Sequence, residues 1–195
     1  MQLNDYEEFP TDLPVLVEDD LFLYPFMISP IFVSDEDNKK AIDFAFEHNS
    51  MLAVIPSKPG MEGERDFDSV YACGVAGTIM RKIDLPDGRV KILFQGMTRV
   101  CVQEQIQVSP MIATVDQLAD EEVDPKRIDA ILDVVREKVR AFSGIAGQNF
   151  PLDLVKTIEE NKDPGRIADL ICSMLKMKKQ TAYDLFTQIN LEKRL

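Results

Sequence analysis

Three prolines interrupt the apolar segment that runs from Leu13 to Val33, at positions 14, 25 and 30. Because proline has no backbone N–H to donate to a neighbouring strand, it is confined to sheet edges, bulges and strand ends. The segment therefore predicts several short strands, separated by an acidic turn at residues 18–20. One long strand is not expected.

The residue order of this segment resembles that of a known protein family. It reads Leu-Pro-Val-Leu, an acidic step and then Tyr-Pro-x-Met-x-x-Pro, which resembles the opening of the N-terminal domain of the Lon family of ATP-dependent proteases. Residues 34–55, 73–102 and 163–170 resemble later blocks of that domain in the same order, and residues 191–195 resemble its end. Gln95 differs from the family, which more often has Glu before the glycine. The resemblance covers nearly the whole chain.

The first 118 residues show the patterns of β structure with one helix. Ser34, with Asp37 three positions later, predicts the start of a helix that runs to about Glu47. A buried strand is predicted at 51–55, and residues 56–69 have the prolines, glycines and charges of a mobile loop. We expect four further strands, with Gly74 and Gly77 at bulges or close contacts. These strands cover residues 71–83, 89–95, 98–107 and 110–116.

Helical spacing begins after about Leu118. Asp124 and Pro125 predict an N-cap followed by a proline in the first helical turn. The apolar residues of this helix share one face: Ile128, Ile131, Leu132, Val135, Val139 and Phe142. Pro151 predicts the start of a second helix and Asp163-Pro164 the start of a third. Three or four helices are therefore expected to form a bundle.

The expected fold class is α+β, with a β-rich subdomain at residues 1–118 and a helical subdomain at residues 119–195. For the first subdomain, the resemblance implies the PUA-like pseudo-barrel of Lon N-terminal domains. Asn190 predicts the cap of a last helix that is only beginning at Leu195. A truncated last helix indicates a fragment of a longer polypeptide.

Composition excludes several classes of protein. The chain holds 34 Asp and Glu against 22 Lys and Arg, a net charge of −12, so it repels phosphate backbones and no nucleic acid is expected as a partner. Cys73, Cys101 and Cys172 include no close pair and predict reduced thiols, with neither a disulfide framework nor a zinc ribbon. The acidic first eight residues do not resemble a signal peptide, and no apolar run reaches membrane-spanning length. A cytoplasmic protein without membrane contact is expected.

The acidic residues are concentrated at the beginning of the chain. Residues 1–60 hold 12 acidic and 3 basic side chains. A charge excess of this kind is most often a solvated face that keeps a protein in solution. The alternative interpretation is that it attracts basic polypeptides.

No catalytic group of residues is evident. His48, the single histidine, falls at the end of a predicted helix, where a capping or surface role is expected. No phosphate-binding loop occurs, and the acidic clusters at 19–20, 35–37 and 121–122 have no His or Cys nearby to support a metal site. The expected list of catalytic residues, metals and cofactors for this chain is therefore empty. The chain alone is not expected to be an enzyme.

The candidate binding residues are apolar. In the strand 90–95, alternation places Val90, Ile92 and Phe94 inside and Lys91, Leu93 and Gln95 outside. A single exposed leucine is ordinary, but a contiguous apolar patch usually marks an interaction site. We therefore expect a patch in which Leu93 joins residues of the proline-broken segment and of the predicted loop. Its other members are Tyr24, Met27, Pro30, Met61 and Phe67.

The resemblance implies a function as well as a fold. It implies that the full-length protein is a homo-oligomeric Lon protease, with six copies in the ring. Such a protease uses ATP, Mg²⁺ and a Ser-Lys dyad to degrade damaged and short-lived regulatory proteins. The dyad and the ATPase module are expected beyond Leu195, and this portion is expected to bind unfolded polypeptides and to help organise the ring. The alternative is a free-standing PUA-like module for RNA or a small ligand, which requires a basic patch on the barrel and a chain that is complete at residue 195.

Overall fold

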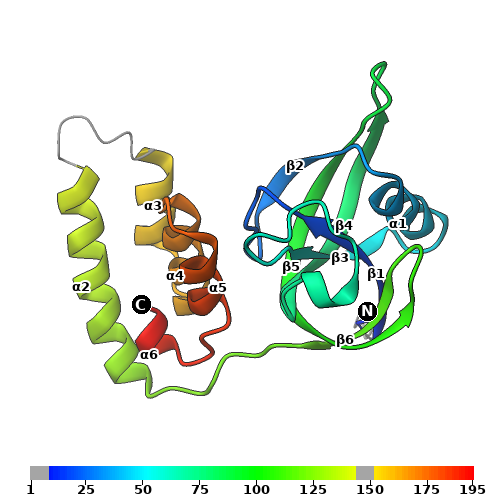
Figure 1. The fold of residues 1–195 in the computed structure, drawn as a ribbon. Coiled ribbons are helices and arrows are strands. Elements are labelled where there is room, and N and C mark those ends of the chain that lie inside the picture. The colour runs from blue at the N-terminus through cyan, green and yellow to red at the C-terminus, as the bar shows by residue number, and fades with distance from the viewer. Residues whose placement is uncertain (1–8, 144–151) are drawn as a thin grey trace, which may run out of the picture.

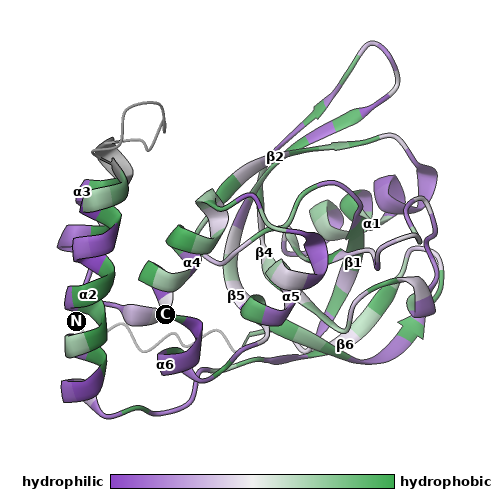
Figure 2. Ribbon diagram, turned by 60° about the vertical axis from the view of Figure 1, so that its left-hand side comes forward, coloured by the Kyte–Doolittle hydropathy of each residue, from purple (hydrophilic) through white to green (hydrophobic). Residues whose placement is uncertain are grey.

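The computed structural model describes residues 9–143 and 152–195. It has the mixed α+β fold that was expected, with a six-stranded sheet in the first part of the chain and helices in the second (Figure 1). The strands are β1 Asp12–Glu18, β2 Ile28–Val33, β3 Met51–Pro56, β4 Cys73–Asp84, β5 Val90–Gln107 and β6 Ile112–Gln117. Figure 2 shows that hydrophobic residues predominate along these strands, whereas hydrophilic ones line the turns.

The sheet closes on itself because β5 has three partners. It pairs with β4 along most of its length, with β2 through its first half and with β6 through its second half. β6 also pairs with β1, which runs parallel to β3, and β3 pairs with β4. Five strands thus form a closed barrel, and β2 stands outside it at the end of the strand order. Among the described strands, β2 therefore pairs with β5 alone.

Gly96 marks the point where β5 exchanges β2 for β6. The sequence predicts two strands here, 89–95 and 98–107, but the structure has one strand of 18 residues. The amide of Gly96 donates to the Met27 carbonyl at 2.9 Å, and its carbonyl accepts from the Phe26 amide at 3.0 Å. A Cβ on Gly96 would lie 3.0 Å from the Tyr24 carbonyl oxygen. A residue without a side chain therefore lets the strand continue through the crossing.

Helix α1, Glu36–Glu47, covers one side of the barrel and begins one residue later than expected (Figure 1). Its N-cap is Asp35, whose carboxylate accepts from the Asn38 amide at 2.9 Å, and not Ser34. Asn38 in turn binds the backbone of β1, since its side chain accepts from the Val17 amide and donates to the Val17 carbonyl, both at 2.8 Å. This pair of hydrogen bonds fixes the helix against the strand.

The cysteines differ from the expectation of three reduced thiols. Cys73 of β4 and Cys101 of β5 form a disulfide, and Cys172 is free and buried. The two bonded cysteines are 28 residues apart in the sequence but lie directly opposite each other in the β4–β5 ladder. The strand register, which the cysteine spacing does not reveal, brings them together.

Within the described residues, the helices that follow the barrel are α2 Pro125–Ser143, α3 Leu152–Glu160, α4 Pro164–Met174, α5 Lys179–Phe186 and α6 Leu191–Arg194. The predicted caps Asp163 and Asn190 are confirmed, because each side chain accepts from a backbone amide of its helix. Pro151 lies outside the described residues, and α5 was not predicted. Ile158, Ile167 and Leu132 are at the centre of the bundle core. Within the described ranges, no helix is long and apolar enough to cross a membrane.

The bundle docks on the barrel through α4 and α5. Phe186 of α5 and Cys172 of α4 belong to the same buried apolar cluster as Phe94 of β5. The Phe186 ring meets the Tyr24 ring edge-on with centroids 6.0 Å apart. Barrel and bundle therefore share one core, even though a connector at residues 118–124 separates them along the chain (Figure 1).

Candidate functional site

The proline-broken segment forms a ridge on the surface of the molecule. Residues 21–27 lead from the end of β1 into β2, and Phe26 stands out from them with 52 % of its surface exposed. Phe26 has a φ of 65°, a left-handed conformation that is a rare outlier for a bulky residue. The hydrogen bond from its amide to the Gly96 carbonyl holds it there. The ring is thereby turned outward, where it contributes nothing to the core.

Strand β2 continues this ridge with alternate exposed residues. Ile28, Pro30 and Phe32 are exposed, whereas Ser29, Ile31 and Val33 are buried. On β5, Val90, Ile92 and Phe94 are buried and the residues between them are half-buried, so the predicted alternation is confirmed. Pro30 lies directly opposite Leu93 in the β2–β5 ladder. We call the following residues the apolar surface: Phe26, Ile28, Pro30, Phe32, Leu93 and Met97.

The remaining residues of the predicted patch have other positions. Tyr24 was expected at the surface but is only 2 % exposed, because Phe22 and Phe186 cover its ring. Met27 is half-buried and packs against the main core cluster. Phe67 packs against the cluster on the other side of the barrel, in the short 3-10 helix η1 Phe67–Ser69. Met61 is 47 % exposed in the loop before η1.

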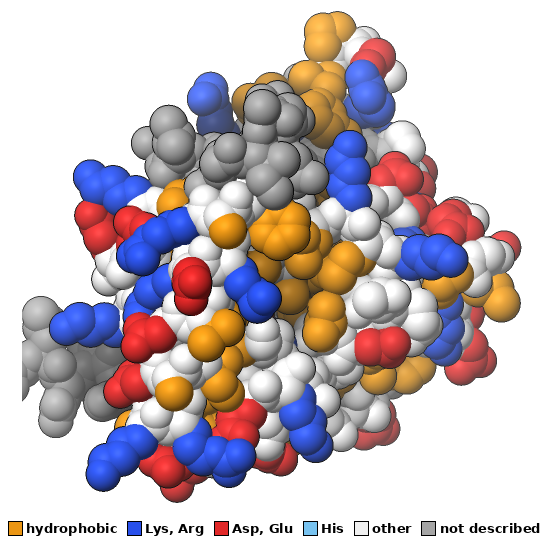
Figure 3. All heavy atoms as spheres, turned by 90° about the vertical axis from the view of Figure 1, so that its left-hand side faces the viewer, with side chains coloured by type: hydrophobic (Ala, Val, Ile, Leu, Met, Phe, Trp, Pro, Cys, Tyr) orange, Lys and Arg blue, Asp and Glu red, His pale blue; other side chains and the backbone are white. Residues whose placement is uncertain are grey.

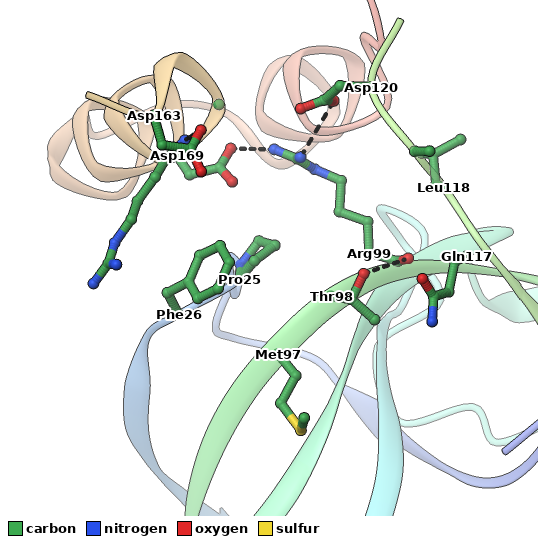
Figure 4. Close-up of a pocket in the computed structure, with 13 residues that line it drawn as sticks. Pro25, Phe26, Met97, Thr98, Arg99, Gln117, Leu118, Asp120, Asp163 and Asp169 are labelled. Carbon is green, nitrogen blue, oxygen red and sulfur yellow. Dashed lines mark hydrogen bonds and ion pairs between the residues drawn. The ribbon is translucent and has the colours of Figure 1, made fainter. Parts of the chain in front are cut away.

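A first hollow lies between the ridge and helix α4. It encloses about 290 Å³ and is lined on the barrel side by Pro25, Phe26 and Met97. From the bundle side Arg166 reaches across, with its guanidinium carbon 5.1 Å from the centre of the Phe26 ring. Figure 4 shows Phe26 and Pro25 below the carboxylates of α4, with Met97 on the strand beside them. The hollow is thus half apolar and half charged.

A buried ion-pair cluster forms the back of this hollow. Arg99 of β5 binds Asp169 of α4 and lies 3.6 Å from Asp120 of the connector, toward which it points in Figure 4. Asp120 also pairs with Arg194 of α6 at 2.7 Å. Four segments are therefore joined by two arginines and two aspartates. Sequence reasoning missed this cluster, since its members are far apart in the chain and become neighbours only when the bundle docks.

Burial is the largest cause of the pKa shifts of Asp169 and Arg99 in this cluster. Removal from water raises the pKa of Asp169 from 3.8 to about 6, in spite of the attraction of Arg99. The same cause lowers the pKa of Arg99. The Nε atoms of Arg99 and Arg194 are buried and have no hydrogen-bond partner among the residues that the structure describes. The charged groups of this cluster bind one another, and they join the barrel strand β5 to the connector and to helices α4 and α6.

A second hollow runs along the other side of the ridge, beside β2. It encloses about 530 Å³, and most of its walls are apolar. Its polar lining residues are Glu18, Asp20, Ser29 and, from α4, Ser173. The apolar walls come from the residues before β2 and from β2 itself: Leu21, Phe22, Leu23, Met27, Pro30 and Phe32.

Nothing in the described residues suggests a catalytic or metal centre. No three His, Cys, Asp or Glu side chains are grouped so that they could hold a metal ion in residues 9–143 and 152–195. His48 is the C-cap residue of α1, and its Nδ1 lies 2.7 Å from the Phe44 carbonyl oxygen, as its predicted capping role requires. Figure 3 views the molecule from the side of α2 and shows hydrophobic side chains gathered at the centre of that face, with charged side chains of both signs around them. The arrangement suits binding.

Comparison with known proteins identifies the chain. A family model described as the ATP-dependent protease La (LON) substrate-binding domain matches residues 12–195. The chain belongs to the Lon family. It is 48% identical over 195 residues to the Lon protease of Campylobacter concisus, covering 100% of this chain and 24% of that protein. The Lon protease of Helicobacter pylori strain 26695 is 40% identical over 196 residues, which cover 97% of this chain and 23% of that protein.

A solved structure agrees with the Lon fold of this chain. The N-terminal domain of Mycobacterium avium complex Lon protease superimposes with a TM-score of 0.70 over 94% of this chain and 93% of that one, at 18% sequence identity. Such a low identity establishes the fold alone. The Lon chain described here spans about a quarter of the length of its curated relatives.

Proposed function

We propose that this Lon-family domain recognises unfolded polypeptides by means of the apolar surface on β2 and β5. The single observation that carries the proposal is a row of large apolar side chains, Phe26, Ile28 and Phe32, each more than half exposed at 51% or above. Burying such side chains in a native protein would stabilise it, so their exposure has a cost that a binding function explains.

The proposal includes the role of the domain in a longer protein. We propose that it belongs to a cytoplasmic ATP-dependent serine protease that degrades misfolded and short-lived regulatory proteins, and that it helps organise a hexameric ring. In that protein ATP and Mg²⁺ serve other modules, and this domain alone neither hydrolyses ATP nor cleaves polypeptides. Its family membership and the names of its relatives support this role.

The expected affinity is low. Burial of one leucine-sized side chain contributes roughly 1.5–3 kcal/mol, and association costs several kcal/mol. Three or four such residues would give a dissociation constant in the micromolar to millimolar range. Weak sites of this kind become effective when several copies act together on one chain, because binding at one copy raises the effective concentration at the next.

A module that binds RNA or a small ligand is the less favoured alternative. The net charge of −12 opposes binding to a phosphate backbone. Family membership favours the protease. Measured binding of single-stranded RNA at physiological salt would be the result that revives it.

Substitutions on the apolar surface test the proposal. Leu93→Asp and Ile28→Asp place a charge on the surface without entering the core, because both side chains lie on the outer face of their strands. We expect each to weaken the binding of a denatured, labelled model protein several-fold and to leave the thermal melt nearly unchanged. Val134→Asp is the matched control, since Val134 is 51 % exposed on α2, away from this surface.

Two results would contradict the proposal. If both variants bind as tightly as the unchanged chain, the substrate surface lies elsewhere. If Val134→Asp weakens binding as much as they do, the effect is one of general charge. A collapse of the melting temperature in Leu93→Asp would instead show that this half-buried leucine supports the barrel, and Ile28→Asp then decides.

A further inference from the structure

Glu18 is an unusual residue to find in the wall of an apolar hollow. It is the last residue of β1 and only 8 % exposed. One carboxylate oxygen, Oε1, accepts from the amides of Asp20 and Leu21 at 3.0 and 3.1 Å. Its other oxygen makes no hydrogen bond or ion pair with any of the residues that the structure describes, and the side chain lines the second hollow. A nearly buried carboxylate normally has a cationic partner.

Two basic side chains, Arg65 and Lys179, bind Asp19, the residue next to Glu18. Arg65 binds the Asp19 carboxylate at 2.9 Å and Asp35 at 3.3 Å. Lys179 donates to the Asp19 carbonyl oxygen at 2.5 Å. Burial and the nearby Asp20 and Asp19 charges raise the pKa of Glu18, which is the direction expected for a carboxylate without a counterion. The exposed Asp20 likewise has no side-chain partner in the described ranges.

The lining of the hollow suits a long basic side chain. Its lining includes Phe22, Met27 and Pro30, which suit the methylene stem of a lysine or arginine, and the carboxylates of Glu18 and Asp20, which have no cationic partner among the described residues. Phe32, which also lines the hollow, has basic neighbours, because Lys91 Nζ and Arg89 Cζ lie 5.3 and 5.7 Å from the centre of its ring. A positive charge is therefore favoured near Glu18 and disfavoured near Phe32.

We propose that the hollow beside β2 takes a lysine or arginine side chain of an unfolded polypeptide, with its charge at Glu18 and Asp20. This inference rests on the proposed function, because the same polypeptide lies across the apolar surface. The domain would then prefer apolar segments that carry a basic residue over apolar segments that carry none. Pro30 and Phe32 line the hollow and also belong to the apolar surface, so one extended segment can contact both.

The test compares two labelled peptides on the 195-residue chain. Both are unstructured and rich in Leu and Phe; one carries lysines, and in the other the same lysines are acetylated, which removes the charge and keeps the stem. We expect the lysine peptide to bind about five- to tenfold more tightly by fluorescence anisotropy. Glu18→Gln should reduce that preference to about twofold or less, because glutamine keeps the acceptor for the two amides and loses the charge.

A matched variant and a second variant complete the design. Glu104→Gln removes the same charge from an exposed position of β5 far along the strand and should keep the preference. Asp20→Asn should lower the preference about twofold; it provides the answer if a melt shows that Glu18→Gln is poorly folded.

Three results would overturn the inference. Equal binding of the two peptides to the unchanged chain would overturn it and leave the proposed function standing. A loss of preference in Glu104→Gln equal to that in Glu18→Gln would also overturn it, by showing a general charge effect. Failure of both peptides to bind would overturn the proposed function and this inference together.

Discussion

Asp169 shows how one residue at the joint between barrel and bundle sets a dependence on pH. Its native pKa, raised to about 6 by burial, lies above the unfolded value of 3.8. The native state therefore holds a proton that the unfolded state has released in the window between these values. The stability that Asp169 contributes is complete below about pH 4 and is lost as the pH rises through about 6.

This residue gives a first prediction. A difference of about 2 between the two pKa values corresponds to about 3 kcal/mol. We expect the free energy of unfolding of the unchanged chain to fall by about that amount relative to Asp169→Asn between pH 4 and pH 7, as measured by urea unfolding at several pH values. A difference that stays flat, or that rises with pH, would show that Arg99 keeps the pKa of Asp169 near its ordinary value.

At the scale of the element, the β4–β5 pair gives a second prediction, from two glycines. A Cβ on Gly77 would lie 2.0 Å from the Gln95 carbonyl oxygen, whereas a Cβ on Gly88, in the turn with a φ of +84°, would meet nothing within 4 Å. Gly77→Ala is therefore expected to cost about 3 kcal/mol or more, since backbone must move. Gly88→Ala should cost only about 1 kcal/mol, for the left-handed turn alone. If the two variants lose the same free energy of unfolding in chemical denaturation, β4 and β5 can move apart at Gly77 without cost, which would contradict the prediction.

The same pair of strands gives a third prediction, from its cysteines. A cross-link that closes a loop of 28 residues stabilises a protein by about 3–4 kcal/mol in the chain-entropy estimate. We expect reductant to lower the melting temperature of the oxidised chain by several degrees and to have no effect on the Cys73→Ser/Cys101→Ser double variant. Cys172 is buried, with a pKa raised to about 11, and should resist alkylation until the chain unfolds. Identical melts with and without reductant would contradict the prediction.

Elements could be predicted from the sequence wherever local signals decide them. Caps at Asp163 and Asn190 and the alternation around Leu93 depend on neighbouring residues, and all three are confirmed. The predictions that Tyr24 is exposed and that Cys73 is reduced were wrong, because both depend on residues far away in the sequence. Whether Tyr24 is covered depends on Phe186, and whether Cys73 has a partner depends on the register with Cys101.

The candidate site also has a part that could be predicted from the sequence and a part that could not. The apolar surface was found in part, because Pro30 and Leu93 each carry a local signal of exposure. The two hollows were not found, since the lining of each includes a residue of α4, Arg166 in one and Ser173 in the other. Their formation depends on how the bundle docks, which no local pattern reports.

For the whole molecule, the division into residues 1–118 and 119–195 gives a fourth prediction. Limited proteolysis should cut the connector at 118–124 or the loop at 56–69 before it cuts inside the strands of residues 71–107, because β4 and β5 are paired with each other in the sheet. The two products of a connector cut should still elute together on a native gel-filtration column, because Phe186 of the second piece is buried in the core of the first. Prompt cuts within the strands, or separation of the pieces without denaturant, would contradict this.

Pro30 limits how another chain can pair with the edge strand β2. Of the described strands, β2 pairs only with β5, and a free strand edge is a template on which another chain can add and sheet growth can begin. A proline in the middle of that edge offers no N–H to an incoming strand, so the ladder cannot be extended past it. Contacts are then limited to side chains, which are short-lived. Under the proposed function, a polypeptide held in this way would leave without having added a strand to β2, so the domain would not seed the aggregates that unfolded proteins form.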